Sequence, residues 1–252
     1  MPIISRIRQF LMLCLPVITV QADDLTMAVP DDAYPPYVVH NDQGEAIHGL
    51  LIDPLRAALT ALEMSLELLE LPVLRSTYML DAGKLDARME SPQWLANPDD
   101  FLWLDVGVTL EDILVYRADL PYVPDSLTTL EGSEIITHLG YIYPTLDPLF
   151  HSGKLTRLDK HTEREMIDAL LNAPAESPRL LVIERKVWEW YLPQLDIPPH
   201  IRLQVSPLLV GCAQLQIQLA RTARLETLQP RLQGWIDAHH STSSRSACTP
   251  AS

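Results

Sequence analysis

Residues 85–94 read LDARMESPQW, and they place two opposite charges at the end of a segment with the pattern of a buried strand. Apolar and polar residues alternate over residues 85–90, which predicts a β-strand with one face in a core. Arg88 and Glu90 lie on the other face. Because residues two apart on a strand are about 7 Å apart, these long side chains can pair with each other or flank one polar ligand.

Ser91 and Trp94 follow directly and extend the candidate site. A hydroxyl and a flat apolar ring beside a charge pair are suited to form the wall of a small-molecule site. The alternative is that Arg88 and Glu90 form an internal salt bridge that fixes a loop, and that Trp94 belongs to the core. The sequence leaves both interpretations open.

The segments before this stretch predict a βαβαβ unit, which gives a parallel sheet with right-handed crossovers. Asp53 is suited to cap the first helix and Pro54 to begin it. Pro72 is expected to start a second helix, which stops at Gly83. The strands of this unit are expected at residues 25–29, 66–71 and 85–90.

A second α/β unit is expected after about residue 120. Thr162 and Glu165 form a capping box at the start of a predicted helix. After a further strand at 208–212, apolar spacing from Leu215 through Leu219 to Ile236 predicts a long helix, which Pro230 should break or kink. The other expected elements are strands at 134–138, 155–159 and 179–184 and a helix at 144–151.

The first 22 residues have the pattern of a secretory signal peptide. Arg6 and Arg8 precede an apolar run over residues 10–20, and residues 20–22 resemble a cleavage site after Ala22. Cleavage removes two of the 19 basic residues and none of the 33 acidic ones, so the formal charge changes from −14 to 17 − 33 = −16. This charge disfavours nucleic acids and anionic membranes as partners. No second apolar stretch of about 18 residues follows, so the expected mature protein is soluble.

Enzyme and metal motifs are missing from the sequence. The histidines do not have HExxH spacing, and there is no GxSxG elbow, P-loop or CxxC pair. We therefore expect no cofactor, no metal and no catalytic residues. Cys212 and Cys248 remain after cleavage and could form a disulfide, although residues 241–252 have the composition of a disordered tail.

Several fragments together resemble one protein family in their order and spacing. They are YPPYVV (34–39), a turn with Gly44 and Gly49 that leads into a helix, LDAGKLDA (80–87) and LEDILVYR (110–117). In this order the chain resembles the periplasmic solute-binding proteins of ABC importers, of the type that binds amino acids.

The resemblance implies an α/β fold of the type II periplasmic-binding-protein kind, with two lobes and a hinge of two crossing strands. Lobe one would comprise residues 23–117 and 206–240, and lobe two residues 118–205. A small polar solute would bind between the lobes, where strand ends and helix N-termini converge. The protein would be a periplasmic monomer with a membrane permease or a sensor protein as its partner.

The resemblance also suggests the ligand contacts. Tyr37 stands where family members often stack an aromatic ring on the ligand, Tyr141 and Tyr143 follow the first strand of lobe two, and Glu184 is near the usual partner of a ligand amine. Tyrosine is equally suited to packing between lobes. The candidate ligand contacts are Tyr37, Arg75, Arg88, Glu90, Ser91, Trp94, Tyr141, Tyr143 and Glu184.

One departure from the family concerns the ligand carboxylate. Amino-acid binders usually carry a threonine-rich loop with an arginine after the third strand, whereas the matching SPQWLANPDDF (91–101) has neither residue type. Arg88 or Arg75 could supply a substitute cation. The sequence predicts a solute-binding protein, with a periplasmic sensory or accessory domain as the alternative, and a dehydratase-like enzyme on the same fold as a further one.

Overall fold

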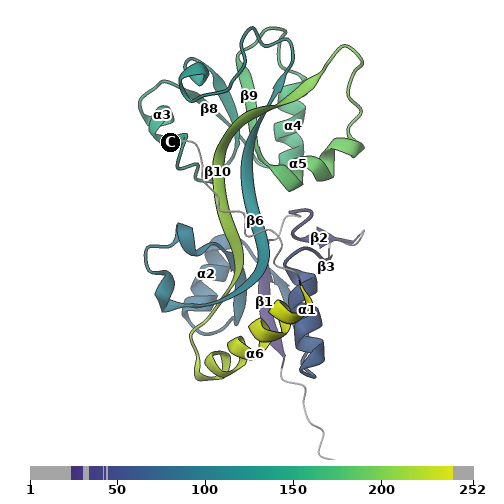
Figure 1. The fold of residues 1–252 in the computed structure, drawn as a ribbon, viewed down its shortest axis with the longest axis vertical. Helices are drawn as coiled ribbons and strands as arrows, with labels where there is room; N and C mark the ends of the chain where they lie inside the picture. The colour runs from purple at the N-terminus through teal and green to yellow at the C-terminus, as the bar shows by residue number, and fades with distance from the viewer. Residues whose placement is uncertain (1–23, 31–33, 42, 44, 241–252) are drawn as a thin grey trace, which may run out of the picture.

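The computed structural model describes residues 24–30, 34–41, 43 and 45–240, and the predicted signal peptide and tail therefore lie outside the described residues. The described chain forms two α/β lobes, one above the other in Figure 1, which two long strands connect. This is the predicted two-lobed fold.

Lobe one is built on the predicted βαβαβ unit. Strand β1 pairs in parallel with both β4 and β5, so the two crossovers place their helices on the sheet. A separate two-stranded sheet, β2–β3, follows β1. The elements of this unit are β1 (Leu25–Val29), β2 (Val39–His40), β3 (Ala46–His48), α1 (Ile52–Ala61), β4 (Leu66–Glu70), α2 (Val73–Asp81) and β5 (Ala87–Glu90).

Lobe two is built in the same way on a second parallel sheet, β9-β7-β8. Strand β7 pairs in parallel with β8 and β9, and the apolar run of β9 is almost fully buried. The capping Thr162 accepts a hydrogen bond from Glu165 N (3.2 Å) at the start of α4, as predicted. The elements are β7 (Glu134–His138), α3 (Asp147–His151), β8 (Thr156–Lys160), α4 (Glu163–Leu171), β9 (Arg179–Glu184) and α5 (Arg185–Tyr191).

Two long antiparallel strands, β6 (Leu102–Arg117) and β10 (Leu203–Leu219), run through both lobes (Figure 1). At one end β5 pairs with β10, and at the other β9 pairs with β6, so the strand order is β4-β1-β5-β10-β6-β9-β7-β8. The two lobes therefore share one continuous sheet. The exact lobe boundaries given above remain a prediction.

The final helix, α6 (Ala223–His239), returns to lobe one and packs against α1 and β6. Its buried side chains Leu225, Leu228, Leu232 and Ile236 complete the lobe-one core. None of the helices in the described ranges is long and apolar enough to cross a membrane.

Three details of the sequence interpretation are wrong. Helix α1 begins one residue before Asp53, whose side chain makes no cap bond and lies near Arg56 instead. Leu215 and Leu219 belong to β10, because the LQIQL alternation has the period of a strand. Pro230 does not break α6, which continues for nine residues beyond it to His239.

Candidate functional site

A small cavity lies between the lobes, at the carboxyl ends of the strands. Tyr34, from the loop after β1, lines it from lobe one, and side chains that follow β7 and β9 line it from lobe two. In open α/β sheets this edge is where ligands bind. The lining residues are Tyr34, Asp112, His138, Tyr141, Tyr143, Glu163, Met166, Val182, Ile183, Glu184 and Val187.

The Tyr34–Tyr37 loop reaches from lobe one toward this cavity. It is closed by hydrogen bonds from Tyr37 N and Val38 N to Tyr34 O (2.9 and 2.8 Å), and the two tyrosine rings stack with centroids 5.2 Å apart. Gly49 packs directly beneath it, since a Cβ at this residue would lie 1.9 Å from Tyr37 O. The loop therefore depends on a glycine at position 49.

Glu184 is the buried end of β9 and the N-cap of α5. Its carboxylate accepts hydrogen bonds from Val187 N (2.9 Å) and Glu111 N (3.3 Å). Burial is the largest influence on its pKa and raises it, while these bonds and Tyr37 lower it. The Tyr37 hydroxyl lies close enough to Glu184 for this effect, yet it makes no hydrogen bond of normal geometry with a described residue.

Asp112 lies beside Glu184, because the two residues are paired in the β6–β9 register. Burial, followed by repulsion from Glu184, raises the pKa of Asp112 to about 6. Opposite Asp112 on β10 is Gly211, where a Cβ would lie 2.2 Å from Asp112 Oδ2. The glycine therefore makes room for the carboxylate.

This raised pKa predicts how stability changes with pH. The native state binds the Asp112 proton more tightly than the unfolded chain, whose aspartate pKa is about 3.9. The contribution to stability is therefore complete below about pH 4 and is lost as the pH rises through 6. Asp112→Asn is expected to flatten this part of the stability profile, measured by urea unfolding between pH 4 and 7. The exposed Asp196→Asn is the matched control, and an unchanged slope in Asp112→Asn would contradict the assignment.

The loop after β7 supplies the aromatic part of the cavity. The His138 and Tyr141 rings stack with centroids 4.1 Å apart, and the Tyr143 hydroxyl accepts a hydrogen bond from His138 N (3.1 Å). The Arg157 guanidinium lies 5.5 Å from the centre of the Tyr143 ring. His138 Nε2 is buried without a hydrogen-bond partner among the described residues.

The residues of the opening stretch occupy a separate place at the end of β5. Arg88 and Glu90 form a salt bridge whose side chains are only 8 % and 12 % exposed, and Arg88 also donates to Thr77 Oγ1 of α2. Ser91 is buried and caps the short turn Pro92–Trp94 by accepting a bond from Gln93 N (3.3 Å). These contacts match the internal salt bridge that the sequence left open.

Two further candidates from the sequence are exposed. Trp94 is 53 % exposed and is not part of the core. Arg75 lies on the exposed side of α2 and has no ion pair with any residue in the described ranges. Of the candidates from the sequence, Tyr141, Tyr143 and Glu184 line the cavity, and Tyr37 lies beside Glu184. Outside the lining are Arg75, Arg88, Glu90, Ser91 and Trp94.

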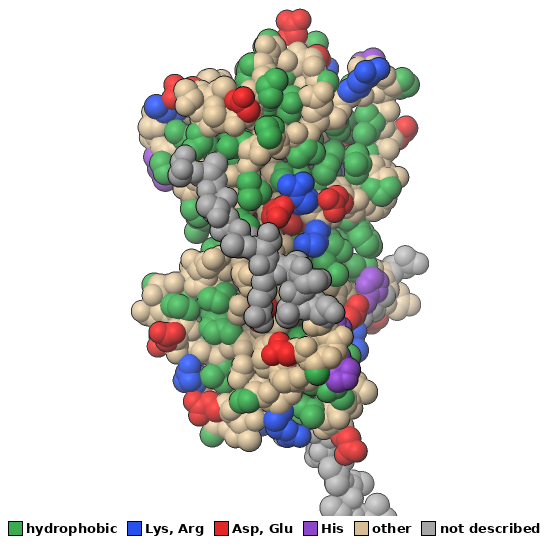
Figure 2. Space-filling model, viewed as in Figure 1, with side chains coloured by type: hydrophobic (Ala, Val, Ile, Leu, Met, Phe, Trp, Pro, Cys, Tyr) green, Lys and Arg blue, Asp and Glu red, His purple; other side chains and the backbone are tan. Residues whose placement is uncertain are grey.

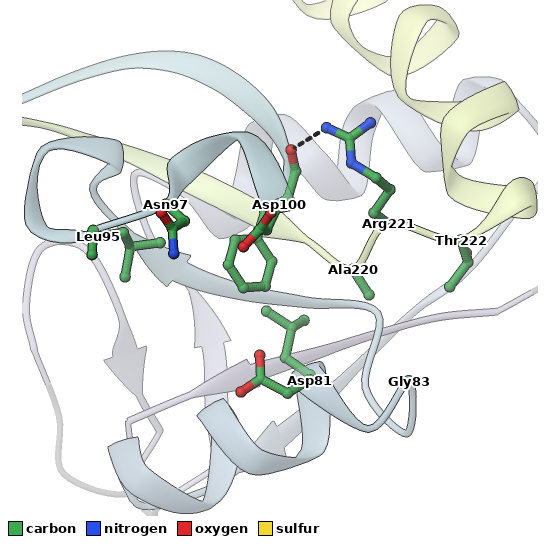
Figure 3. A pocket seen from close by; sticks show the side chains of 11 residues that line it. Asp81, Gly83, Leu95, Asn97, Asp100, Ala220, Arg221 and Thr222 are labelled. Atoms are coloured by element: carbon green, nitrogen blue, oxygen red, sulfur yellow. Dashed lines mark hydrogen bonds between the residues drawn. The ribbon is translucent and has the colours of Figure 1, made fainter.

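A larger hollow of about 590 Å³ lies entirely within lobe one (Figure 3). Asp81 comes from the end of α2, and Arg221 and Thr222 come from the segment before α6. Arg221 donates to the carbonyl oxygens of Asp99 (2.8 Å) and Phe101 (2.9 Å). Because the hollow lies at the amino ends of the lobe-one strands and its arginine is committed to backbone, we place the ligand site between the lobes.

The described residues contain neither a metal site nor both cysteines of a disulfide. The described residues contain no group of three or more His, Cys, Asp or Glu side chains that could hold a metal ion. Cys212 on β10 is disulfide-bonded. Cys248, its candidate partner from the sequence, lies outside the described residues.

The sequence interpretation missed Tyr34, Asp112, His138 and Glu163. Asp112 is an acid within the apolar run LEDILVYR, and its partner in space is 72 positions later in the chain. A charged residue inside a buried strand was the available signal, because such a charge needs a partner or a functional reason.

Comparisons with known proteins support the fold. No family model matches the chain, and no curated protein matches it. Among solved structures, an arginine-bound arginine-binding protein from T. maritima has 12 % identity and a TM-score of 0.63, covering 85 % of this chain and 95 % of that one. A binding component of an ABC transporter from Wolinella succinogenes, in complex with lysine, has 16 % identity and a TM-score of 0.68, covering 87 % and 92 %.

An ancestral amino-acid-binding protein, a precursor of cyclohexadienyl dehydratase, has 14 % identity and a TM-score of 0.63 and covers 85 % of this chain and 88 % of that one. The likeness to these three structures extends over most of each chain, although few residues are identical. The chain therefore has the two-lobed fold of the periplasmic binding proteins.

Proposed function

We propose that this chain is an exported solute-binding protein that holds a small polar molecule between its lobes. The observation that carries the proposal is the cavity to which both lobes contribute, with Tyr34 on one side and Glu184 on the other. Strands β6 and β10 connect the lobes and are suited to act as a hinge around a bound ligand. The similar solved structures of an arginine-bound and a lysine-bound protein share this two-lobed fold.

In this proposal Tyr37, Tyr141, Tyr143 and Glu184 lie at or beside the ligand. The buried Arg88–Glu90 pair holds the end of β5, and Trp94 and Arg75 remain on the lobe-one surface near it. The mature protein works as a periplasmic monomer and delivers its ligand to the permease of an ABC importer. A membrane sensor in place of the permease is the alternative partner.

The test is a thermal-shift screen of residues 23–252 against amino acids, amines, organic acids and sugars. A ligand present at 100 times its Kd adds about 2.7 kcal/mol to stability, which produces a clear rise in the melting temperature. Small-angle scattering of the same samples should show a smaller radius of gyration with the ligand, because the lobes close. A screen in which no compound changes either quantity counts against the proposal.

The Arg75→Ala variant is expected to bind the best ligand from this screen almost as tightly as the natural chain does. Because Arg75 is exposed and lies outside the cavity lining, the variant should keep the Kd for the best ligand within about twofold, since exposed polar substitutions usually change free energies by under 0.5 kcal/mol. Isothermal titration calorimetry measures this. A loss of binding by more than tenfold would show that Arg75 holds the ligand from lobe one.

An enzyme is the second candidate, favoured by the paired carboxylates of Asp112 and Glu184. Burial raises both pKa values, and carboxylates with raised pKa values are suited to general acid–base chemistry. One similar structure is a precursor of a dehydratase. Turnover of a cyclohexadienyl acid by the purified protein, lost in Asp112→Asn, would favour the enzyme over the binding protein.

A further inference from the structure

The described residues that line the interlobe cavity carry three carboxyl groups and, apart from the imidazole of His138, no basic side chain. Asp112, Glu163 and Glu184 contribute carboxyl groups, and neither lysine nor arginine is among the lining residues. The side-chain carboxylate of Asp112 forms no hydrogen bond or ion pair with a residue in the described part of the chain. The cavity is therefore short of positive charge.

The basic side chains nearest to the cavity bind other groups. Arg185 pairs with Glu111 (2.6 Å) and Lys186 donates to Thr109 O (3.1 Å). Arg157 pairs with Asp159 (2.7 Å) and with Asp147 (3.6 Å). None of the three takes Asp112 as its ion-pair partner, so a cationic ligand can.

A buried ring nitrogen of His138 points to a ligand that donates a hydrogen bond. His138 Nδ1 lies 3.0 Å from Leu139 O, and because a carbonyl can only accept, Nδ1 carries a proton; in the Nδ1–H tautomer the other ring nitrogen, Nε2, is an acceptor. The His138 residue is only 9 % exposed, and its Nε2 atom is buried with no hydrogen-bond partner among the described residues. The buried Tyr37 hydroxyl, which can donate or accept, lies beside Glu184 and outside the cavity lining. The three carboxyl groups and His138 Nε2 therefore give the cavity several hydrogen-bond acceptors.

The size and the rings of the cavity fit a cationic head group. Its volume is about 20 Å³, which is room for one water-sized group such as an ammonium. Tyr34, Tyr141 and Tyr143 line it, and tyrosine faces attract cations. No group of described side chains is suited to a metal ion, so the chemistry favours an organic cation.

Among the residues that the structure describes, lobe one contributes no lysine or arginine to the lining that could bind a ligand carboxylate. Arg88 is buried in its pair with Glu90, and residues 91–101 contain no arginine or lysine. Arg75 lies on α2, outside the lining. A zwitterionic amino acid would therefore place its carboxylate near acidic groups without a counter-charge, which costs free energy.

We infer that the ligand of this site is an organic amine or guanidinium cation without a carboxylate, with its positive head held between Asp112 and Glu184. The inference rests on the proposed solute-binding function and narrows its ligand class. The acidic chain as a whole, with a formal charge of −14, favours the approach of such cations.

Two matched ligand pairs test the inference by isothermal titration calorimetry on the mature chain. The probes are lysine with 1,5-diaminopentane, and arginine with 4-guanidinobutylamine, which differ within each pair only by the carboxylate. We expect the carboxylate-free member of at least one pair to bind at least tenfold more tightly. In Asp112→Asn its affinity should fall at least tenfold, while the exposed Asp196→Asn leaves it unchanged.

The outcomes separate this inference from the proposed function. If the amino acid binds as tightly as its decarboxylated partner, or if only an organic acid or sugar binds, the solute-binding function stands and the cation inference is wrong. If an amine binds but Asp112→Asn keeps its affinity while remaining folded by circular dichroism, the assigned site is wrong. If no probe of any class binds, the proposed function itself fails.

Discussion

Arg88→Met is expected to lower the free energy of unfolding by about 3–5 kcal/mol, the usual cost of leaving one member of a buried ion pair without its partner. The variant removes the charge that faces Glu90, whose side chain is 12 % exposed, and the bond to Thr77 of α2. Among the described residues, the Glu90 carboxylate then keeps the hydrogen bond from Ser91 N (2.9 Å) but no cation. Urea unfolding followed by circular dichroism measures the difference.

The double variant Arg88→Met, Glu90→Leu is expected to recover most of this loss, because two apolar side chains can replace a buried pair at little net cost. Arg164→Met is the control at the exposed Arg164–Asp168 pair, 53 % and 46 % exposed, and should cost no more than about 0.5 kcal/mol. A loss below 1 kcal/mol in Arg88→Met would show that water reaches the pair.

Gly49→Ala is expected to lower the free energy of unfolding by about 3 kcal/mol, at the upper end of the usual range for inserting an atom into a packed site. The added Cβ would meet the backbone of Tyr37, which cannot rotate away as a side chain can. The Tyr34–Tyr37 loop would have to move away from Glu184. Ligand affinity should therefore fall together with stability, as measured by unfolding and calorimetry.

Gly234→Ala provides a control with the opposite sign. Gly234 lies in α6, and a Cβ there would meet nothing within 4 Å. Alanine is the better helix former by about 0.8–1.0 kcal/mol, so this variant should be more stable than the natural chain. Equal effects at both glycines would refute the packing argument at Gly49.

Helices and strands could be predicted from the sequence where their residue pattern depends only on neighbouring positions in the chain. The strands at 134–138 and 179–184 match β7 and β9 residue for residue, because continuous apolar runs bounded by polar residues identify buried strands. The capping box at Thr162 likewise marked the start of α4. These signals are contained within a few residues of sequence.

The long hinge strand β10 was harder to predict because its apolar positions fit two periods. Leu215 and Leu219 are four residues apart and satisfy a helical spacing, yet Ile217 between them completes a strand alternation. Pairing with β6 and β5 on its two sides decides in favour of the strand. That information comes from tertiary structure and is absent from the local pattern.

The candidate site could be predicted only in part, for a related reason. The family resemblance suggested Tyr37, and it also suggested Glu184, at the end of the predicted strand 179–184, where ligands bind in α/β sheets. Asp112 becomes part of the site only because β6 runs antiparallel to β9 and places it beside Glu184. Arg88 and Glu90 were candidate ligand contacts in the sequence, but in the structure they neutralise each other in a buried salt bridge.

The chain leaves lobe one at β6 and returns to it through β10 and α6, the last described elements. During synthesis from the N-terminus, lobe one therefore lacks a central strand and a covering helix until β10 and α6 have left the ribosome. Until then its nascent form exposes an incomplete apolar face. Lobe one is therefore expected to complete its folding only after lobe two has been synthesised, and removal of α6 should disrupt lobe one.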